Sequence, residues 1–124
     1  MYDLPKIFMD SDNNHITDIV VARALEYIRS NVRKPIQVSE IAEFVSVSRR
    51  ELERRFKKTL QSSIHQEIKI ARVHLIKRML LETPDSVSEI AVKLGFLENH
   101  IARYFRDVEG ISPVEYRRKN LCAV

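Results

Sequence analysis

At 124 residues, with 44% hydrophobic and 31% charged side chains, the chain can build one domain or two small subdomains that share a helix. Because it has only two Gly and four Pro, and apolar residues recur three and four positions apart, an all-α fold is predicted rather than a turn-rich β fold. The formal net charge is +4, with −3 in residues 1–18 and +7 in the remainder, so nucleic acid is favoured over a membrane as partner.

The first segment, residues 1–17, shows no periodicity and is predicted to be a linker or an N-terminal tail. Thr17 or Asp18 is expected to cap a first helix that extends to about residue 31. Its buried face is predicted to hold Val21, Leu25 and Ile28.

The most informative feature of the sequence is an internal repeat with an offset of 49 residues. Residues 35–63 align with residues 84–112 without a gap, and nine of the 29 pairs are identical, where chance would give about two. The chain therefore contains two copies of one structural unit.

Each copy has the residue pattern of a helix-turn-helix motif. A proline ends the preceding helix, and Ser39 or Ser88 is expected to cap a short helix with a glutamate in its first turn. A tight turn follows, at residues 46–48 in the first copy and 95–97 in the second. A longer third helix then buries two apolar residues four positions apart. These are Leu52 and Phe56 in the first copy, and Ile101 and Phe105 in the second.

Between the copies, residues 63–82 are predicted to form one connecting helix. Twenty residues would span about 30 Å, close to the roughly 34 Å between successive major-groove faces on one side of B-DNA. After the second copy, Ser112 and Pro113 are expected to start a last helix as its cap and first residue. The predicted organisation has about seven helices, with helix-turn-helix subdomains at residues 18–62 and 83–120.

The exposed sides of the two third helices carry residue types that contact DNA. Arginine pairs with guanine, asparagine with adenine, and a carboxylate accepts from cytosine. The candidates for base contact are Arg49, Arg50, Glu53, Arg54, Asn99, His100 and Arg103. The candidates for phosphate contact are Ser39, Lys57, Lys58, Ser88 and Arg106. Net charge is +4 over residues 49–58 and zero over 98–107, so the first copy is expected to bind more tightly.

Other classes of function find little support in the sequence. The four histidines lack the paired spacing of a metal site, and Gly95 and Gly110 cannot form a glycine-rich phosphate loop, so neither an enzyme nor a cofactor is predicted. The single cysteine, Cys122, gives no disulfide framework, and no membrane span or signal peptide is apparent, so a cytoplasmic location is expected. The four phenylalanines of the two copies are expected in the core: Phe44, Phe56, Phe96 and Phe105.

With these elements in place, the chain resembles the AraC family of bacterial transcription regulators over about residues 18–118. The residues that carry the resemblance are Val87-Ser88-Glu89-Ile90-Ala91, Gly95-Phe96, Arg103, Phe105 and Gly110-Ile111-Ser112-Pro113-Val114-Glu115-Tyr116-Arg117. Residues 21–29 and 48–57 are most similar to the xylose-operon activator branch. Regulators of that branch carry a sugar-binding sensor before this domain, so the resemblance implies that residues from Leu4 on belong to a linker and that the sensor is absent from this chain.

The chain departs from the family pattern in three places. Members usually have one more residue in the second unit between Gly-Phe and Arg-x-Phe, which leaves two starts, one position apart, for the second recognition helix and puts the contacts of Glu98, Asn99 and His100 in question. Ser46 and Gln61 stand where glycine is common. If their φ angles are positive, each costs about 1 kcal/mol locally.

The sequence therefore predicts a sequence-specific binder of double-stranded DNA that places two recognition helices in adjacent major grooves and regulates transcription. The resemblance implies activation, of sugar-utilisation genes, with RNA polymerase as a further candidate partner. One alternative is an all-α protein-interaction adaptor without intrinsic DNA specificity. Another is a complete regulator that needs no sensor, which the native start residue would decide.

Overall fold

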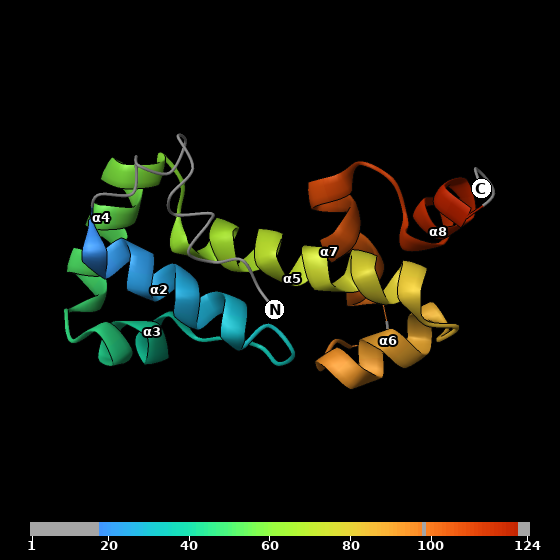
Figure 1. The fold of residues 1–124 in the computed structure, drawn as a ribbon, viewed down its shortest axis with the longest axis horizontal. Coiled ribbons are helices and arrows are strands. Elements are labelled where there is room, and N and C mark those ends of the chain that lie inside the picture. The colour runs from blue at the N-terminus through green and yellow to red at the C-terminus, as the bar shows by residue number, and fades with distance from the viewer. Residues whose placement is uncertain (1–17, 98, 122–124) are drawn as a thin grey trace. The chain divides into compact units, whose positions relative to one another are not determined.

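The computed structural model describes residues 18–97 and 99–121, and these residues form seven helices and no strand (Figure 1). The all-α prediction is confirmed. The helices are α2 (Ile19–Ser30), α3 (Val38–Val45), α4 (Arg49–Leu60), α5 (Ile64–Glu82), α6 (Val87–Leu94), α7 (His100–Glu109) and α8 (Pro113–Leu121). The described residues divide into two compact units, one of residues 18–31 and 36–68, the other of 32–35 and the part from 69 on.

In the first unit, α2 packs against α3 and α4. Asp18 caps α2, because its carboxylate accepts from the backbone N–H groups of Val20 and Val21 at 2.9 and 3.3 Å. Leu52 and Phe56 of α4 are both 0% exposed, as predicted, and burial of each such side chain contributes about 1.5–3 kcal/mol. The core of this unit therefore fixes which side of α4 faces water.

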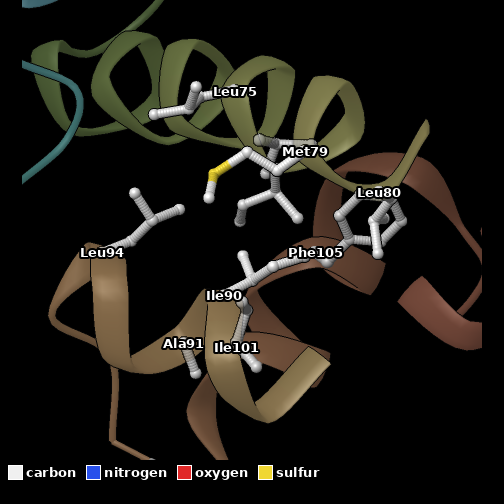
Figure 2. Close-up of a cluster of buried hydrophobic side chains, with 10 residues drawn as sticks. Leu75, Met79, Leu80, Ile90, Ala91, Leu94, Ile101 and Phe105 are labelled. Atoms are coloured by element: carbon white, nitrogen blue, oxygen red, sulfur yellow. The ribbon is translucent and has the colours of Figure 1, made fainter. Parts of the chain in front are cut away.

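The second unit has an equivalent core, in which side chains of α5, α6 and α7 point toward one another (Figure 2). Ile101 and Phe105, the predicted pair on α7, are 1% and 0% exposed. They pack with Leu75, Met79, Leu80, Ile90, Ala91 and Leu94. The two apolar residues again leave the opposite side of the third helix exposed.

The predicted N-caps of the two short helices are wrong. The caps are Gln37 and Ser86, and Ser39 and Ser88 are the second residues of α3 and α6. The reason is a glutamate three residues after each cap, which accepts from the backbone N–H of the cap at 3.1 Å for Glu40 and 2.7 Å for Glu89. In the second copy the Ser86 hydroxyl also accepts from the N–H of Glu89 at 3.1 Å, the reciprocal arrangement of a capping box.

The prediction that Phe44 lies in the core is also wrong. Its side chain is 47% exposed, because α3 buries the side that carries Val38, Ile41, Ala42 and Val45. The Phe44 ring packs against Tyr27, with 4.8 Å between the ring centroids, and the guanidinium of Arg23 lies 5.3 Å from its centroid. The predicted start of the last helix is confirmed, since α8 begins at Pro113 and the Ser112 hydroxyl accepts from the N–H of Glu115.

Residues with left-handed backbone end the helices of both motifs at equivalent positions. In the first copy these are Ser46 and Gln61, with φ of 61° and 52°, and 49 residues later they are Gly95 and Gly110, with φ of 80° and 86°. The two non-glycine residues thus adopt the positive φ that disfavours residues with a Cβ. The positive φ angles on which the expected strain depends are thus present at both positions, and the size of the cost stays a prediction.

We predict that Ser46→Gly raises the free energy of unfolding by about 0.5–1 kcal/mol. Glycine removes the left-handed strain from the folded state and also increases the conformational entropy of the unfolded state, and the first effect is expected to be the larger. Urea denaturation followed by circular dichroism measures the change, with Ser46→Ala as the control that keeps a Cβ. Gly110→Ala is the reverse test: a Cβ there meets no atom within 4 Å, so destabilisation would come from φ alone. A Ser46→Gly variant no more stable than Ser46→Ala would contradict the account.

Candidate nucleic-acid interface

All twelve residues predicted to contact DNA are exposed in the structure. On α4, the burial of Leu52 and Phe56 leaves the exposed face to the predicted candidates Arg50, Glu53 and Lys57. The start of this helix is fixed by the Ser48 hydroxyl, which accepts from the backbone N–H of Glu51 at 3.0 Å. The side chains predicted for DNA contact therefore lie on a well-anchored helix.

Glu51 and Arg55 organise α4, and sequence reasoning assigned neither a role. The Glu51 carboxylate accepts from Arg54 at 3.1 and 2.7 Å and from Arg55 at 2.8 Å. Arg55 also donates to both carboxylate oxygens of Asp18, the cap of α2, at 3.1 and 3.2 Å. These contacts attach α4 to the start of α2. The spacing of three and four residues between Glu51 and the arginines is the signal that could have found them.

The arginines of α4 differ in how they are held. Arg49 donates to Glu53 at 3.3 Å, and Arg54 is held by Glu51 through two nitrogens. Among the described residues, Arg50 has no hydrogen bond or ion pair. Exposed pairs of this kind contribute about 0–1 kcal/mol. Contact with a ligand would therefore require Arg49 and Arg54 to leave a carboxylate, whereas Arg50 has none to leave.

The third helix of the second copy, α7, starts later than α4, its equivalent in the first copy. α4 begins at Arg49, and the equivalent position in the second copy is residue 98, but α7 begins at His100. Both helices end at equivalent positions, Leu60 and Glu109. Asn99 occupies the N-cap of α7 without a side-chain hydrogen bond, and the N–H of His100 donates to the carbonyl of Leu97 at 2.9 Å. Asn99, His100 and Arg103 are thus in the cap and the first four residues of α7, while Glu98 lies outside the described residues.

The acidic side chains at the end of α7 pair with lysines of α5. Lys69 donates to Asp107 at 2.8 Å, and Lys77 lies 3.0 Å from Glu109. The hydrogen bond from Lys69, with smaller contributions from Arg103 and Arg106, holds the pKa of Asp107 below its ordinary value. The zero charge counted along residues 98–107 therefore understates the positive charge around Arg103 and Arg106. The prediction that the first copy binds more tightly stays a prediction.

The turn between α6 and α7 is anchored by Arg72, a buried arginine of α5 that is only 4% exposed. Its guanidinium donates to the carbonyl of Val32 at 3.0 Å and to the carbonyl of Leu94. It also lies 4.5 Å from the centroid of the Phe96 ring. Burial lowers the pKa of Arg72 from its ordinary value, yet a guanidinium remains charged in proteins. The segment leading into α7 is thus held by a buried cation.

The phosphate candidates of the short helices keep a suitable position despite the corrected caps. Ser39 and Ser88 are exposed and belong to the first turns of α3 and α6. The N-terminal turn of a helix carries partial positive charge and unpaired N–H groups, which favour an anion. Their hydroxyls therefore remain candidates for phosphate contact.

Neither metal binding nor membrane crossing finds support within residues 18–97 and 99–121. No group of three or more His, Cys, Asp or Glu in this part of the chain could hold a metal ion. None of the helices in the same residues combines the length and the apolar character that crossing a membrane requires.

Comparison with known proteins defines the family. A family model described as a helix-turn-helix domain matches residues 41–119. The xylose operon regulatory protein of Escherichia coli K12 is 31% identical over 111 residues, 89% of this chain and 28% of that protein. A solved transcriptional regulator of Chromobacterium violaceum with an AraC-type DNA-binding domain is 28% identical, with a TM-score of 0.77 over 83% of this chain and 93% of that one.

A third similarity is to the DNA-binding domain of AdpA, a global transcriptional factor solved in complex with a target DNA. It is 27% identical, with a TM-score of 0.75 over 83% of this chain and 94% of that one. Fold and matches together define a helix-turn-helix DNA-binding domain. The chain belongs to the AraC-type family of these domains, whose members matched here are transcription regulators and not enzymes. It spans less than a third of the length of the xylose operon regulatory protein.

We predict that Glu51 makes the first unit sensitive to acid. Hydrogen bonds from Arg54 and then Arg55 lower the pKa of Glu51 to about 2 from an ordinary value of 4.5. Because the folded-state pKa is the lower one, the stability from ionised Glu51 is complete above pH 4.5 and is lost as the pH falls toward 2. Glu51→Gln should therefore lower the unfolding midpoint at neutral pH and reduce its dependence on pH below 4.5.

Thermal unfolding at neutral pH and at about pH 3 tests this effect. The control is Glu53→Gln, which should change the midpoint much less, since among the described residues Glu53 pairs only with Arg49, at 3.3 Å. If Glu51→Gln and the unchanged chain had equal midpoints at neutral pH and lost the same amount on acidification, Glu51 would not organise α4.

Proposed function

We propose that this chain binds double-stranded DNA in a sequence-specific manner, with α4 and α7 each entering a major groove, and that it regulates transcription. The observation that carries the proposal is the exposed face of α4, where Arg50 stands without a partner among the described residues and Lys57 and Lys58 are exposed beside it. Its support is membership of the AraC-type family, together with the similarity to a domain that was solved with its target DNA.

The residues divide into two proposed roles. Arg50, Glu53 and Arg54 of α4 are the first candidates for base edges, with Arg49 beside them. From the second copy, Asn99, His100 and Arg103 join them. Exposed cationic side chains farther along the helices, and hydroxyl groups in the first turns of helices, are suited to contact the phosphate backbone of DNA. The proposed phosphate contacts are Lys57, Lys58, Arg106, Ser39 and Ser88.

The regulatory outcome that we propose is promoter activation at genes of sugar utilisation. It is supported by the similarity to a xylose operon regulatory protein over 89% of this chain. RNA polymerase is then the proposed protein partner, and a sugar-binding sensor domain the proposed source of control. A promoter fusion whose expression rises when the chain is supplied, and no longer rises with Arg50→Ala, would support activation, whereas repression would contradict it.

We predict that Arg50→Ala and Lys57→Ala weaken DNA binding in different ways. Loss of a bidentate arginine–guanine contact should reduce affinity for the selected site by about 1–3 kcal/mol and relax one base position. Loss of a phosphate contact should weaken selected and random duplexes alike and lower the salt slope by about one. Fluorescence anisotropy on a site selected from a random duplex library, and on random duplex, measures both. Equal losses on random DNA for the two variants would contradict the assigned roles.

A salt titration tests the proposed function itself. A DNA-binding domain that neutralises several phosphates should lose affinity for random duplex steeply as salt rises, since binding releases counterions. A protein-interaction adaptor would bind random duplex weakly and with little dependence on salt. Weak, salt-independent binding would therefore overturn the proposal, whatever sequence the duplex carried.

A further inference from the structure

Leu97 is an exposed apolar side chain at a position that has another role in the first copy. Its equivalent is Ser48, whose hydroxyl accepts from the N–H of Glu51 and caps α4. In the second copy the N-cap is Asn99, two residues after Leu97, so position 97 has no capping role there. The Leu97 side chain is also 69% exposed, so packing in the core does not explain why a leucine occupies this position. Neither capping nor burial accounts for a leucine at this position.

The location of Leu97 separates it from other exposed apolar residues. Single exposed apolar side chains are common on protein surfaces, and Ile19, Val92 and Val114 are further examples here. Leu97, however, lies two residues before the N-cap of the second recognition helix, and its carbonyl accepts from the N–H of His100, the first residue of that helix, at 2.9 Å. The N-terminal residues of a recognition helix are those that contact base edges in the major groove. Leu97 therefore adjoins the candidates Asn99 and His100.

We infer that Leu97 is a specificity-determining residue that contacts the C5-methyl group of a thymine. The thymine methyl is the apolar group that base pairs present in the major groove, and an apolar side chain is its natural contact. Cytosine lacks this methyl and presents a polar amino group instead. This inference rests on the proposed function and adds to it a preference for thymine in the segment that α7 reads.

Deoxyuridine substitution in the DNA tests the contact directly. Deoxyuridine pairs as thymidine does and lacks only the methyl, so each thymine of the selected site is replaced in turn. We expect one position in the segment read by α7 at which the replacement weakens binding about fourfold, the value for one buried methyl group. With Leu97→Ala or Leu97→Ser, the same replacement should change affinity by less than about 1.5-fold, because the partner of the methyl is gone.

The variants also separate recognition from folding. Leu97→Ser places a small polar side chain at an exposed position two residues before Asn99, the N-cap of α7, so its unfolding midpoint should stay close to that of the unchanged chain, while its methyl discrimination is lost. Val114→Ala is the matched control: Val114 is also exposed, at 58%, but lies on α8, so methyl discrimination should be retained.

Three results would overturn the inference while leaving DNA binding intact. These are a selected site without thymine in the segment read by α7, no effect of deoxyuridine at any position, and equal methyl discrimination by Leu97→Ala and the unchanged chain. Weak, salt-independent binding to every duplex would instead remove the proposed function, and the inference with it.

Discussion

The arrangement of both candidate recognition helices depends on the burial of two apolar residues four positions apart. Leu52 and Phe56 fix α4, and Ile101 and Phe105 fix α7, all at 0–1% exposure. Because residues four apart lie on one side of a helix, their burial sets the rotation of the helix about its axis. The residues on the opposite side are then directed outward, whatever their chemistry. Burial of these pairs thus determines which side chains are available to a ligand, and the charge of those side chains determines which kind of ligand they favour.

Within this shared plan, the two copies of the motif meet the same geometric demands with different chemistry. The first copy places Ser46 and Gln61 at the left-handed positions where the second has glycines. It caps its third helix with a serine and secures it through Glu51, Arg55 and Asp18. The second copy leaves the start of α7 without a side-chain cap and secures the preceding turn through Arg72. Local strain and local anchoring are therefore distributed differently over an otherwise common backbone.

Much of the fold could be predicted because it follows from repeated patterns. The spacing of apolar residues gave the helices and the buried pairs, and the alignment of the copies located the turns. The N-caps were misplaced because Ser39 and Ser88 are adjacent to glutamates, and the decisive spacing is that from Ser86 to Glu89 and from Gln37 to Glu40. Phe44 was assigned to the core by residue type, although its place on α3 leaves the ring at the edge of the buried side.

The residue types of the candidate site could be predicted from the sequence, but the hydrogen bonds and ion pairs among them could not. The exposure of the candidate residues followed from the helical pattern. The way in which the Glu51 carboxylate accepts hydrogen bonds from both Arg54 and Arg55, however, depends on side-chain conformation and on Asp18, which is 37 residues away from Arg55 in the sequence. The later start of α7 also needed the structure, since the two copies are equal in length. The part played by Arg72 depends on backbone groups far away in sequence, which no local pattern reveals.

The partners of Arg72 include two main-chain carbonyls, those of Val32 and Leu94. Carbonyl acceptors are present whatever amino acid occupies a position, so this anchorage is largely indifferent to side-chain identity at the turn. Mutation can therefore alter the residues that follow, Leu97 among them, without loosening the segment that carries them. An anchor that binds main-chain atoms in this way allows surface residues of the turn to change by single substitutions while the architecture of the domain is preserved.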